Sequence, residues 1–225
     1  MRKILLAILL VMGVLIIFEY NGIIRHNEVF AYNYEVKGID VSHWQNDIKW
    51  DQVKQEGIDF AYIKATEGKG FVDDKFLVNW EDADREGIRR GAYHYFTVSS
   101  TGSEQAENSI SIVPKDANAL PPVIDIEVGG VEKDLFLKEL NDYIDKVEEA
   151  YKKKPILYVM YPLYDGYIKG EFEDYQIWVR DIVKPPKLSD DREWFIWQYS
   201  NRGRLNGIQG YVDLNVLNGR LDDFE

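Results

Sequence analysis

From residue 37 onward the chain repeats one pattern, in which short apolar runs rich in β-branched and aromatic residues alternate with longer polar stretches. Runs of this length and composition favour the strand conformation. The pattern predicts eight strands: Gly38–Ser42, Phe60–Thr66, Gly91–Thr97, Val123–Val128, Ile156–Tyr161, Gln176–Asp181, Phe195–Ser200 and Val212–Val216.

The stretches between the earlier strands are amphipathic and have the length of helices. Between residues 75 and 86, for example, Phe76, Trp80 and Ala83 recur at a spacing that places them on one helical face. Glycines at 57 and 87 follow two of these stretches, as glycines do at helix ends. The spacing predicts four helices: Ile48–Glu56, Lys75–Glu86, Ser103–Ile112 (with Ser103 as its N-cap) and Asp134–Lys153.

Strands that alternate with helices predict a parallel sheet. Eight such strands in about 190 residues predict a barrel smaller than the usual ~250 residues. After Tyr161 the connections shorten and become rich in Gly, Pro and Asp, so we expect the last three crossings to lack full helices. The sequence therefore predicts one α/β domain over residues 32–225, an irregular TIM-like barrel with a helix-poor C-terminal third.

The N-terminus has a different pattern. Arg2 and Lys3 precede an uncharged apolar run from Ile4 to Phe18, which is typical of an export signal. The run is short for a bilayer span, which needs about 17–25 residues. Residues 1–31 are therefore expected to form either a cleaved signal peptide or a retained anchor with a short linker, the membrane attachment then lying in residues 4–24. Both alternatives predict an exported protein, either secreted or held on the outer face of the membrane.

Charge and composition exclude several classes of function. The chain has 39 acidic and 27 basic residues, a formal charge of −12, whereas nucleic-acid binding needs a basic surface. It has no cysteine, which excludes disulfides, thiolate catalysis and zinc sites built from cysteines. A hydrophobic content of 45% with 14% aromatic residues is typical of a well-packed globular protein.

The segment PPVIDIEV at residues 121–128 carries the most informative acids. Asp125 and Glu127 lie two residues apart in a predicted strand, so both side chains point to the same face. Two neighbouring carboxylates without counter-charges raise at least one pKa, and a fold keeps such a pair mainly where it opens into a site. The alternative is an ordinary strand end whose acids are solvated or paired with Lys and Arg.

Barrel geometry adds two further acids to this pair. Active sites of such barrels lie at the C-terminal ends of the strands. Asp40 ends the first predicted strand, and closure brings the eighth strand, with Asp213, beside the first. We therefore expect Asp40, Asp125, Glu127 and Asp213 to converge at one mouth.

Carboxylates flanked by aromatic side chains suit glycoside hydrolysis. One acid donates a proton to the leaving oxygen, a second charge stabilises the oxocarbenium-like centre, and aromatic rings stack on sugar faces. Alternatively, Lys64 pairs with Glu67 or Asp125, and the aromatic residues belong to the core and rim. The side chains expected to contact substrate are Trp44, Lys64, Glu67, Tyr95, Tyr158, Trp197 and Gln198.

Six segments carry a family resemblance in the correct order: GIDVSHWQ at 38–45, FAYIKATEG at 60–68, GAYHYF at 91–96, VIDIE at 123–127, IWQYS at 196–200 and GYVDLNVLNG at 210–219. They resemble glycoside hydrolase family 25, the Chalaropsis-type lysozymes or N-acetylmuramidases. The resemblance implies an irregular (β/α)5β3 barrel. It also implies cleavage of the β-1,4 bond between N-acetylmuramic acid and N-acetylglucosamine in the glycan strands of peptidoglycan, without a cofactor or a metal ion.

The resemblance also implies roles for the acids. Glu127 matches the proton donor of the family and Asp125 its second acid, either a nucleophile or a carboxylate that orients the 2-acetamido group of the substrate. Asp40 and Asp213 match acids that shape the site and tune the pair. The two-residue spacing of Asp125 and Glu127 favours a reaction with retention of configuration.

Three alternatives stay open at this point. A chitinase-like family 18 barrel also uses a D-x-E motif, with a further Asp where this chain has Val123. Four acids could instead hold a divalent cation, as in metal-dependent phosphodiesterases. The third alternative is a membrane-tethered module that binds the wall without turnover.

Overall fold

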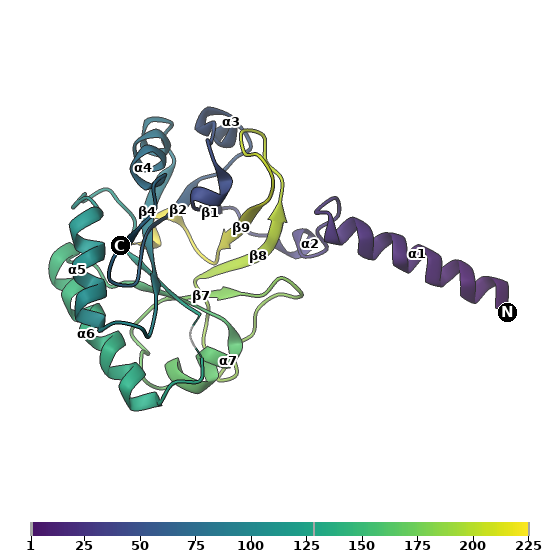
Figure 1. The fold of residues 1–225 in the computed structure, drawn as a ribbon. Helices are drawn as coiled ribbons and strands as arrows, with labels where there is room; N and C mark the ends of the chain where they lie inside the picture. Colours follow the sequence, from purple (N-terminus) through teal and green to yellow (C-terminus); the bar gives the residue numbers. More distant parts are fainter. Residues whose placement is uncertain (1, 128, 225) are drawn as a thin grey trace.

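The computed structural model describes residues 2–127 and 129–224, which form a closed barrel flanked by helices (Figure 1). The strand order is β1-β9-β8-β7-β6-β5-β4-β2, closed by pairing of β1 with β2, while β3 (Phe71–Val72) extends β2 as a hairpin. All eight predicted strands are confirmed. They are β1 (Lys37–Val41), β2 (Phe60–Glu67), β4 (Arg89–Phe96), β5 (Val123–Ile126), β6 (Ile156–Val159), β7 (Ile177–Arg180), β8 (Ile196–Gly203) and β9 (Val212–Leu217).

The direction of β9 corrects the expectation of a parallel sheet. β9 runs antiparallel to both of its neighbours, β8 and β1, whereas the other pairs around the barrel are parallel. The segment between Gly203 and Val212 is too short for the crossover of a dozen or more residues that parallel strands need. As a result, β9 begins at the mouth of the barrel, where the parallel strands end.

Four helices confirm the predicted amphipathic stretches: α3 (Trp50–Gln55), α4 (Phe76–Arg85), α5 (Gly102–Ile112) and α6 (Lys133–Tyr151). The N-cap of α5 is Thr101 rather than Ser103. The Thr101 side chain accepts a hydrogen bond from the backbone N–H of Glu104, whose carboxylate accepts one from the Thr101 backbone in return. Beyond α6, the described chain has only short helical segments, so the helix-poor C-terminal third is also confirmed: α7 (Tyr161–Leu163), η2 (Tyr164–Ile168) and η3 (Leu221–Phe224).

Alternation along the strands divides the core into an outer and an inner part. On β5, Ile124 and Ile126 face outward and belong to the same buried cluster as Phe136 and Leu140 of α6. Val128, the last residue of the predicted strand Val123–Val128, lies outside the described residues. Inside the barrel, aromatic side chains fill the end opposite the mouth: Phe60, Tyr62 and Phe224. The barrel is therefore closed by apolar packing at one end, and its inward positions near the other end are free to be polar.

The N-terminal segment contains α1 (Arg2–Tyr20), which projects from the barrel, and α2 (Glu28–Ala31), which lies beside β8 (Figure 1). Among the described residues, no helix meets the length and apolarity needed to cross a membrane. Asn27 is buried, and its side-chain amide donates to the backbone carbonyls of Asp181 and Tyr199. Contacts with the barrel thus begin before residue 32. The domain boundary between residues 31 and 32 stays a prediction.

Candidate active site

The mouth of the barrel opens into a cavity of about 500 Å³. Its lining brings together the four acids expected from the sequence with two predicted contact residues and six further side chains. The lining consists of Asp40, Tyr93, Val123, Asp125, Glu127, Tyr158, Met160, Trp178, Arg180, Gln198, Asn201 and Asp213.

The Asp125–Glu127 pair lies where β5 ends. Asp125 points inward because Ile124 and Ile126 occupy the outward positions, and Glu127 follows the last strand residue at an exposed position. Burial raises the pKa of Asp125 well above its ordinary value, and the charge of Glu127 raises it further. The buried Oδ1 atom of Asp125 has no hydrogen-bond partner among the described residues. The pair therefore retains a proton at pH values at which an exposed carboxyl has lost it.

A second pair of acids faces the first across the cavity. Asp40 on β1 and Asp213 on β9 are direct cross-strand partners, so their side chains are neighbours on the same face. Burial raises the pKa of both carboxyls, and the charge of Asp213 raises the pKa of Asp40 further. Two neighbouring carboxylates that are both ionised and buried repel each other, so this pair also favours sharing one proton.

Asn215 fixes the orientation of Asp40. Its side-chain amide donates to Asp40 Oδ2 at 2.8 Å, and its Oδ1 accepts from the indole N–H of Trp178 at 3.1 Å. The hydrogen bond from Asn215 lowers the pKa of Asp40 and opposes the effect of burial. Hydrogen bonds that run from the buried Trp178 through the buried Asn215 therefore set both the position and the proton affinity of this acid.

The predicted substrate contacts are divided between cavity and rim. Tyr158 and Gln198 line the cavity, where the Tyr158 hydroxyl donates to Gln198 Oε1 at 2.7 Å. Lys64 lies beside the rim, with its Nζ 2.7 Å from Glu67 and 5.1 Å from the centre of the Tyr95 ring. The structure thus contains the Lys64–Glu67 ion pair that the sequence left open as an alternative to substrate contact.

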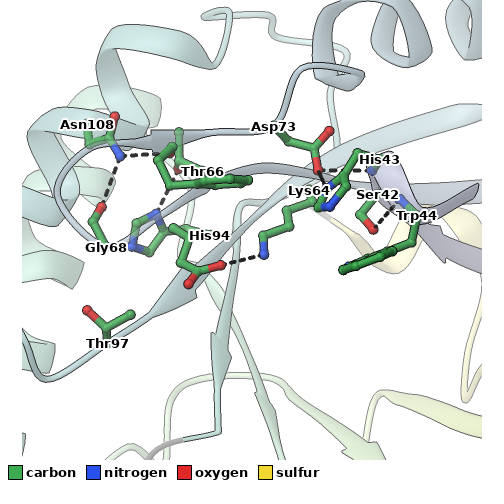
Figure 2. Close-up of polar contacts among 12 residues, drawn as sticks. Ser42, His43, Trp44, Lys64, Thr66, Gly68, Asp73, His94, Thr97 and Asn108 are labelled. Carbon is green, nitrogen blue, oxygen red and sulfur yellow. Dashed lines mark hydrogen bonds and ion pairs between the residues drawn. The ribbon is translucent and has the colours of Figure 1, made fainter. Parts of the chain in front are cut away.

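Trp44 lies on the short helix η1 (His43–Gln45) and is 76% exposed. It is not among the residues that line the cavity. Its ring lies 4.7 Å from that of His43, whose Nδ1 contacts Asp73 at 2.8 Å (Figure 2). Trp44 therefore offers an apolar surface outside the cavity rather than a wall of it.

The structure corrects the prediction for Trp197, which does not reach the cavity. On β8 the inward position belongs to Gln198, so Trp197 faces outward and is completely buried. It packs against Trp194 and Tyr199, and its indole N–H donates to the backbone carbonyl of Asp181 at 2.7 Å. Trp197 is a core residue.

The histidines of the barrel also lie outside the cavity. The buried His94 ring is hydrogen-bonded to Thr66 (Figure 2) and to Gln105, and burial lowers its pKa to about 4. The His43 ring is engaged with Asp73. The acid–base groups at the mouth are therefore carboxyls.

Several cavity residues were missed or only noted as strand residues by the sequence reasoning. Tyr93 lies two residues before Tyr95 on β4, so period-2 alternation could have placed it on the inner face. Arg180 on β7 lines the cavity, and its charge lowers the pKa of Asp213. In the described part of the chain, no group of three or more acidic or histidine side chains has an arrangement that could hold a metal ion.

Comparison with known proteins identifies the family. The profile of glycosyl hydrolases family 25 matches residues 39–208. The chain belongs to this family. Lysozyme M1 of Streptomyces globisporus is 36% identical over 200 residues, covering 82% of this chain and 68% of that protein. The Escherichia coli K12 protein YegX is 37% identical over 199 residues, 86% of this chain and 73% of its own length.

Solved structures agree with this assignment. A family 25 glycosyl hydrolase from Bacillus anthracis superposes with a TM-score of 0.81 at 44% identity, covering 85% of this chain and 93% of the other. A bacterial lysozyme from Streptomyces coelicolor gives a TM-score of 0.75 at 33% identity, with 84% and 94% covered. The predicted family and its (β/α)5β3 barrel are confirmed, and the family 25 chain is a glycoside hydrolase.

Proposed function

We propose that this family 25 enzyme is a lysozyme. It hydrolyses the β-1,4 bond between N-acetylmuramic acid and N-acetylglucosamine in peptidoglycan. One observation carries the assignment: the Asp125–Glu127 pair opens into a cavity that the Asp40–Asp213 pair and aromatic walls share. Similarity to lysozyme M1 and to the Streptomyces coelicolor lysozyme supports the choice of substrate.

In this proposal Glu127 donates a proton to the leaving oxygen. Its exposed position at the end of β5 suits a group that must meet the glycosidic bond of a bound strand. Asp125, deeper in the cavity, serves the anomeric centre, either as a nucleophile or by orienting the 2-acetamido group of the substrate. Both roles lead to retention of configuration, so the product is expected to form first as the β-anomer.

Asp40 and Asp213 supply the electrostatic setting of that reaction. They lie on the side of the cavity formed by β1 and β9, and their shared proton limits the negative charge facing Asp125. Tyr158, Gln198 and Trp178 provide hydrogen bonds and apolar surface for a sugar ring. Tyr95 and Trp44 are proposed to extend this surface beyond the cavity.

We also propose that the enzyme acts outside the cytoplasmic membrane. The substrate class requires it, and the basic and apolar N-terminus suits export as a signal peptide or as an anchor in residues 4–24. Separating culture medium, wall and membrane fractions and sequencing the N-terminus of the recovered protein distinguishes the two. A protein that stays in the cytoplasm contradicts both.

The experiment that tests the function uses purified peptidoglycan, the parent chain and two variants. Glu127→Gln removes the proposed proton donor, and Glu149→Gln on the exposed face of α6 is the matched control. Released fragments are reduced and analysed by mass spectrometry. We expect fragments with reducing-end N-acetylmuramic acid from the parent and the control, and a loss of at least about 100-fold for Glu127→Gln.

Reducing-end N-acetylglucosamine would instead favour the chitinase-like alternative. Absence of fragments from the parent would favour a module that binds the wall without turnover. Equal activity of Glu127→Gln and Glu149→Gln would contradict the role of Glu127.

A further inference from the structure

A second cavity lies beside the catalytic cavity, between the barrel and the N-terminal segment. We call residues 19–27, which lead from the end of α1 to the start of α2, the neck. Three contacts hold it against the mouth side of β7 and β8: His26 Nε2 donates to the carbonyl of Val183 at 2.6 Å, and Asn27 donates to those of Asp181 and Tyr199.

The close approach of the neck depends on one glycine. Gly22 has a φ of +64°, and a Cβ atom at this position would lie 2.2 Å from the backbone oxygen of Arg202. Other residues rarely adopt this conformation and would clash with the end of β8. The neck is therefore seated on the barrel by backbone contact rather than by side chains alone.

Between the neck and the barrel is a cavity of about 240 Å³. Four of its lining residues come from the neck and six from β8 and the segment that follows β7: Glu19, Tyr20, Arg25, His26, Ile182, Val183, Tyr199, Ser200, Asn201 and Arg202. Asn201 also lines the catalytic cavity, so the two cavities are neighbours at the mouth. A branched substrate held in the first could place its side branch in the second.

Arg202 is the group in this cavity that is equipped to bind an anion. Its guanidinium carbon lies 4.2 Å from the ring centre of Tyr20 and 5.1 Å from that of Tyr211. Rings that cover the faces of a guanidinium hold it in place and leave its N–H edge for a planar carboxylate.

The other charged groups of the neck have partners. His26 contacts Glu19 at 2.9 Å, and Arg25 contacts Glu28 at 2.9 Å. Within residues 2–127 and 129–224, by contrast, no carboxylate lies within ion-pair distance of Arg202. A positive charge without a partner is notable in a protein with a net charge of −12.

We propose that the neck cavity binds a carboxylate of the peptide stem that peptidoglycan carries on its muramic acid residues, with Arg202 as the bidentate donor. The proposal rests on the proposed function, because the muramic acid unit must lie in the catalytic cavity, and on the anchor alternative, in which the neck stays attached to the enzyme. Arginine recognises carboxylates through two parallel hydrogen bonds, which gives direction as well as attraction. The local charge offsets the repulsion between an acidic enzyme and an acidic wall.

The test compares two substrates and three variants of the full chain. The substrates are peptidoglycan with intact stems and the same glycan strands after an amidase has removed the stems. The variants are Arg202→Gln, Arg202→Lys and, as a control, Lys154→Gln, which removes a cation stacked 5.4 Å from Tyr175 and not part of either cavity. Melting temperatures of all variants report on folding.

We expect Arg202→Gln to lower kcat/KM about 10-fold on peptide-bearing strands, mainly through KM, and to leave the rate on peptide-free strands unchanged. Arg202→Lys should recover part of the loss because it keeps the charge but not the bidentate geometry. Lys154→Gln should behave as the parent on both substrates.

If Arg202→Gln lowers kcat/KM equally on both substrates, or on neither, the stem-binding proposal is wrong. The proposed function is tested separately, because it requires only that the parent hydrolyse the peptide-free strands. Calorimetry of the parent with a soluble muramyl peptide adds a readout that does not depend on turnover. Equal affinity of the parent and Arg202→Gln for that peptide would also contradict the proposal.

Discussion

The two ends of the barrel are built from the same strands but have opposite chemistry. At the closed end the inward positions are aromatic, as with Phe60 and Tyr62 on β2, and Phe224 from η3 packs against both rings. At the mouth, inward positions on β1, β5 and β9 carry Asp40, Asp125 and Asp213. The closed end buries its side chains without electrostatic cost, whereas the mouth keeps carboxyls in surroundings that raise their pKa values.

This difference shows how stability and activity are divided within one fold. Apolar burial at the closed end stabilises the barrel. The acids at the mouth destabilise it whenever they ionise, and a fold retains such groups where they perform chemistry. Changes at the two ends should therefore affect different measurable quantities.

The largest effect is expected from Asp125→Asn. Activity on peptidoglycan should fall at least about 100-fold, because the proposed second carboxylate is lost. The same variant should be more stable than the parent at neutral pH. The raised pKa means that the folded protein holds a proton that the unfolded chain has released, so the parent loses stability as pH rises above the ordinary value of an aspartate, about 4.

Thermal unfolding of Asp125→Asn and the parent at several pH values checks this sign. The stability difference should be close to zero below about pH 4 and should grow as pH rises. A variant that is less stable than the parent at neutral pH would show that Asp125 is ionised and paired in the folded protein.

At the closed end, Phe224→Ala should have the reverse effect. Phe224 is buried, with ring centres 5.0 Å from Phe195 and 5.5 Å from Phe60. Its truncation should cost about 3 kcal/mol of unfolding free energy, measured by denaturant titration. kcat of the folded variant should stay within about twofold of the parent, because the change is far from the reacting groups. A large fall in kcat with unchanged stability would contradict the assignment of stability to the closed end and of activity to the mouth.

A smaller effect is expected where the two regions meet. Asn215 connects Trp178, which helps to fill the barrel, to Asp40 at the mouth. Asn215→Leu removes a hydrogen bond that lowers the pKa of Asp40, so this pKa should rise and the acidic limb of the pH–rate profile should shift to higher pH. We expect kcat to fall about 10-fold, consistent with the loss of one charged hydrogen bond. An unshifted profile would show that Asn215 has a structural role only.

The fold was largely predictable because its signals are local. Strand alternation and helical spacing identified the eight barrel strands and four helices. The direction of β9 was not predicted, because it depends on the short connection between Gly203 and Val212 rather than on the strand itself.

Alternation along the strands correctly predicted the side chains that line the cavity with the acids, such as Gln198. The same alternation explains the error at Trp197, because a side chain one position away points into the core instead of the cavity. The seating of the neck had no local signal at all. Asn27 looks like an ordinary turn residue, and its hydrogen bonds reach Asp181 and Tyr199 more than 150 positions away.

The most direct test of the division between the two ends is a side-by-side analysis of peptidoglycan fragments released by Glu127→Gln, Phe224→Ala and the parent. Equal amounts of folded protein are used, with melting temperatures measured on the same preparations. We predict that Glu127→Gln keeps the melting temperature of the parent and loses fragments with reducing-end N-acetylmuramic acid. Phe224→Ala should release those fragments at the rate of the parent and melt at a lower temperature. Release of the same fragments by Glu127→Gln at the parental rate would contradict the account.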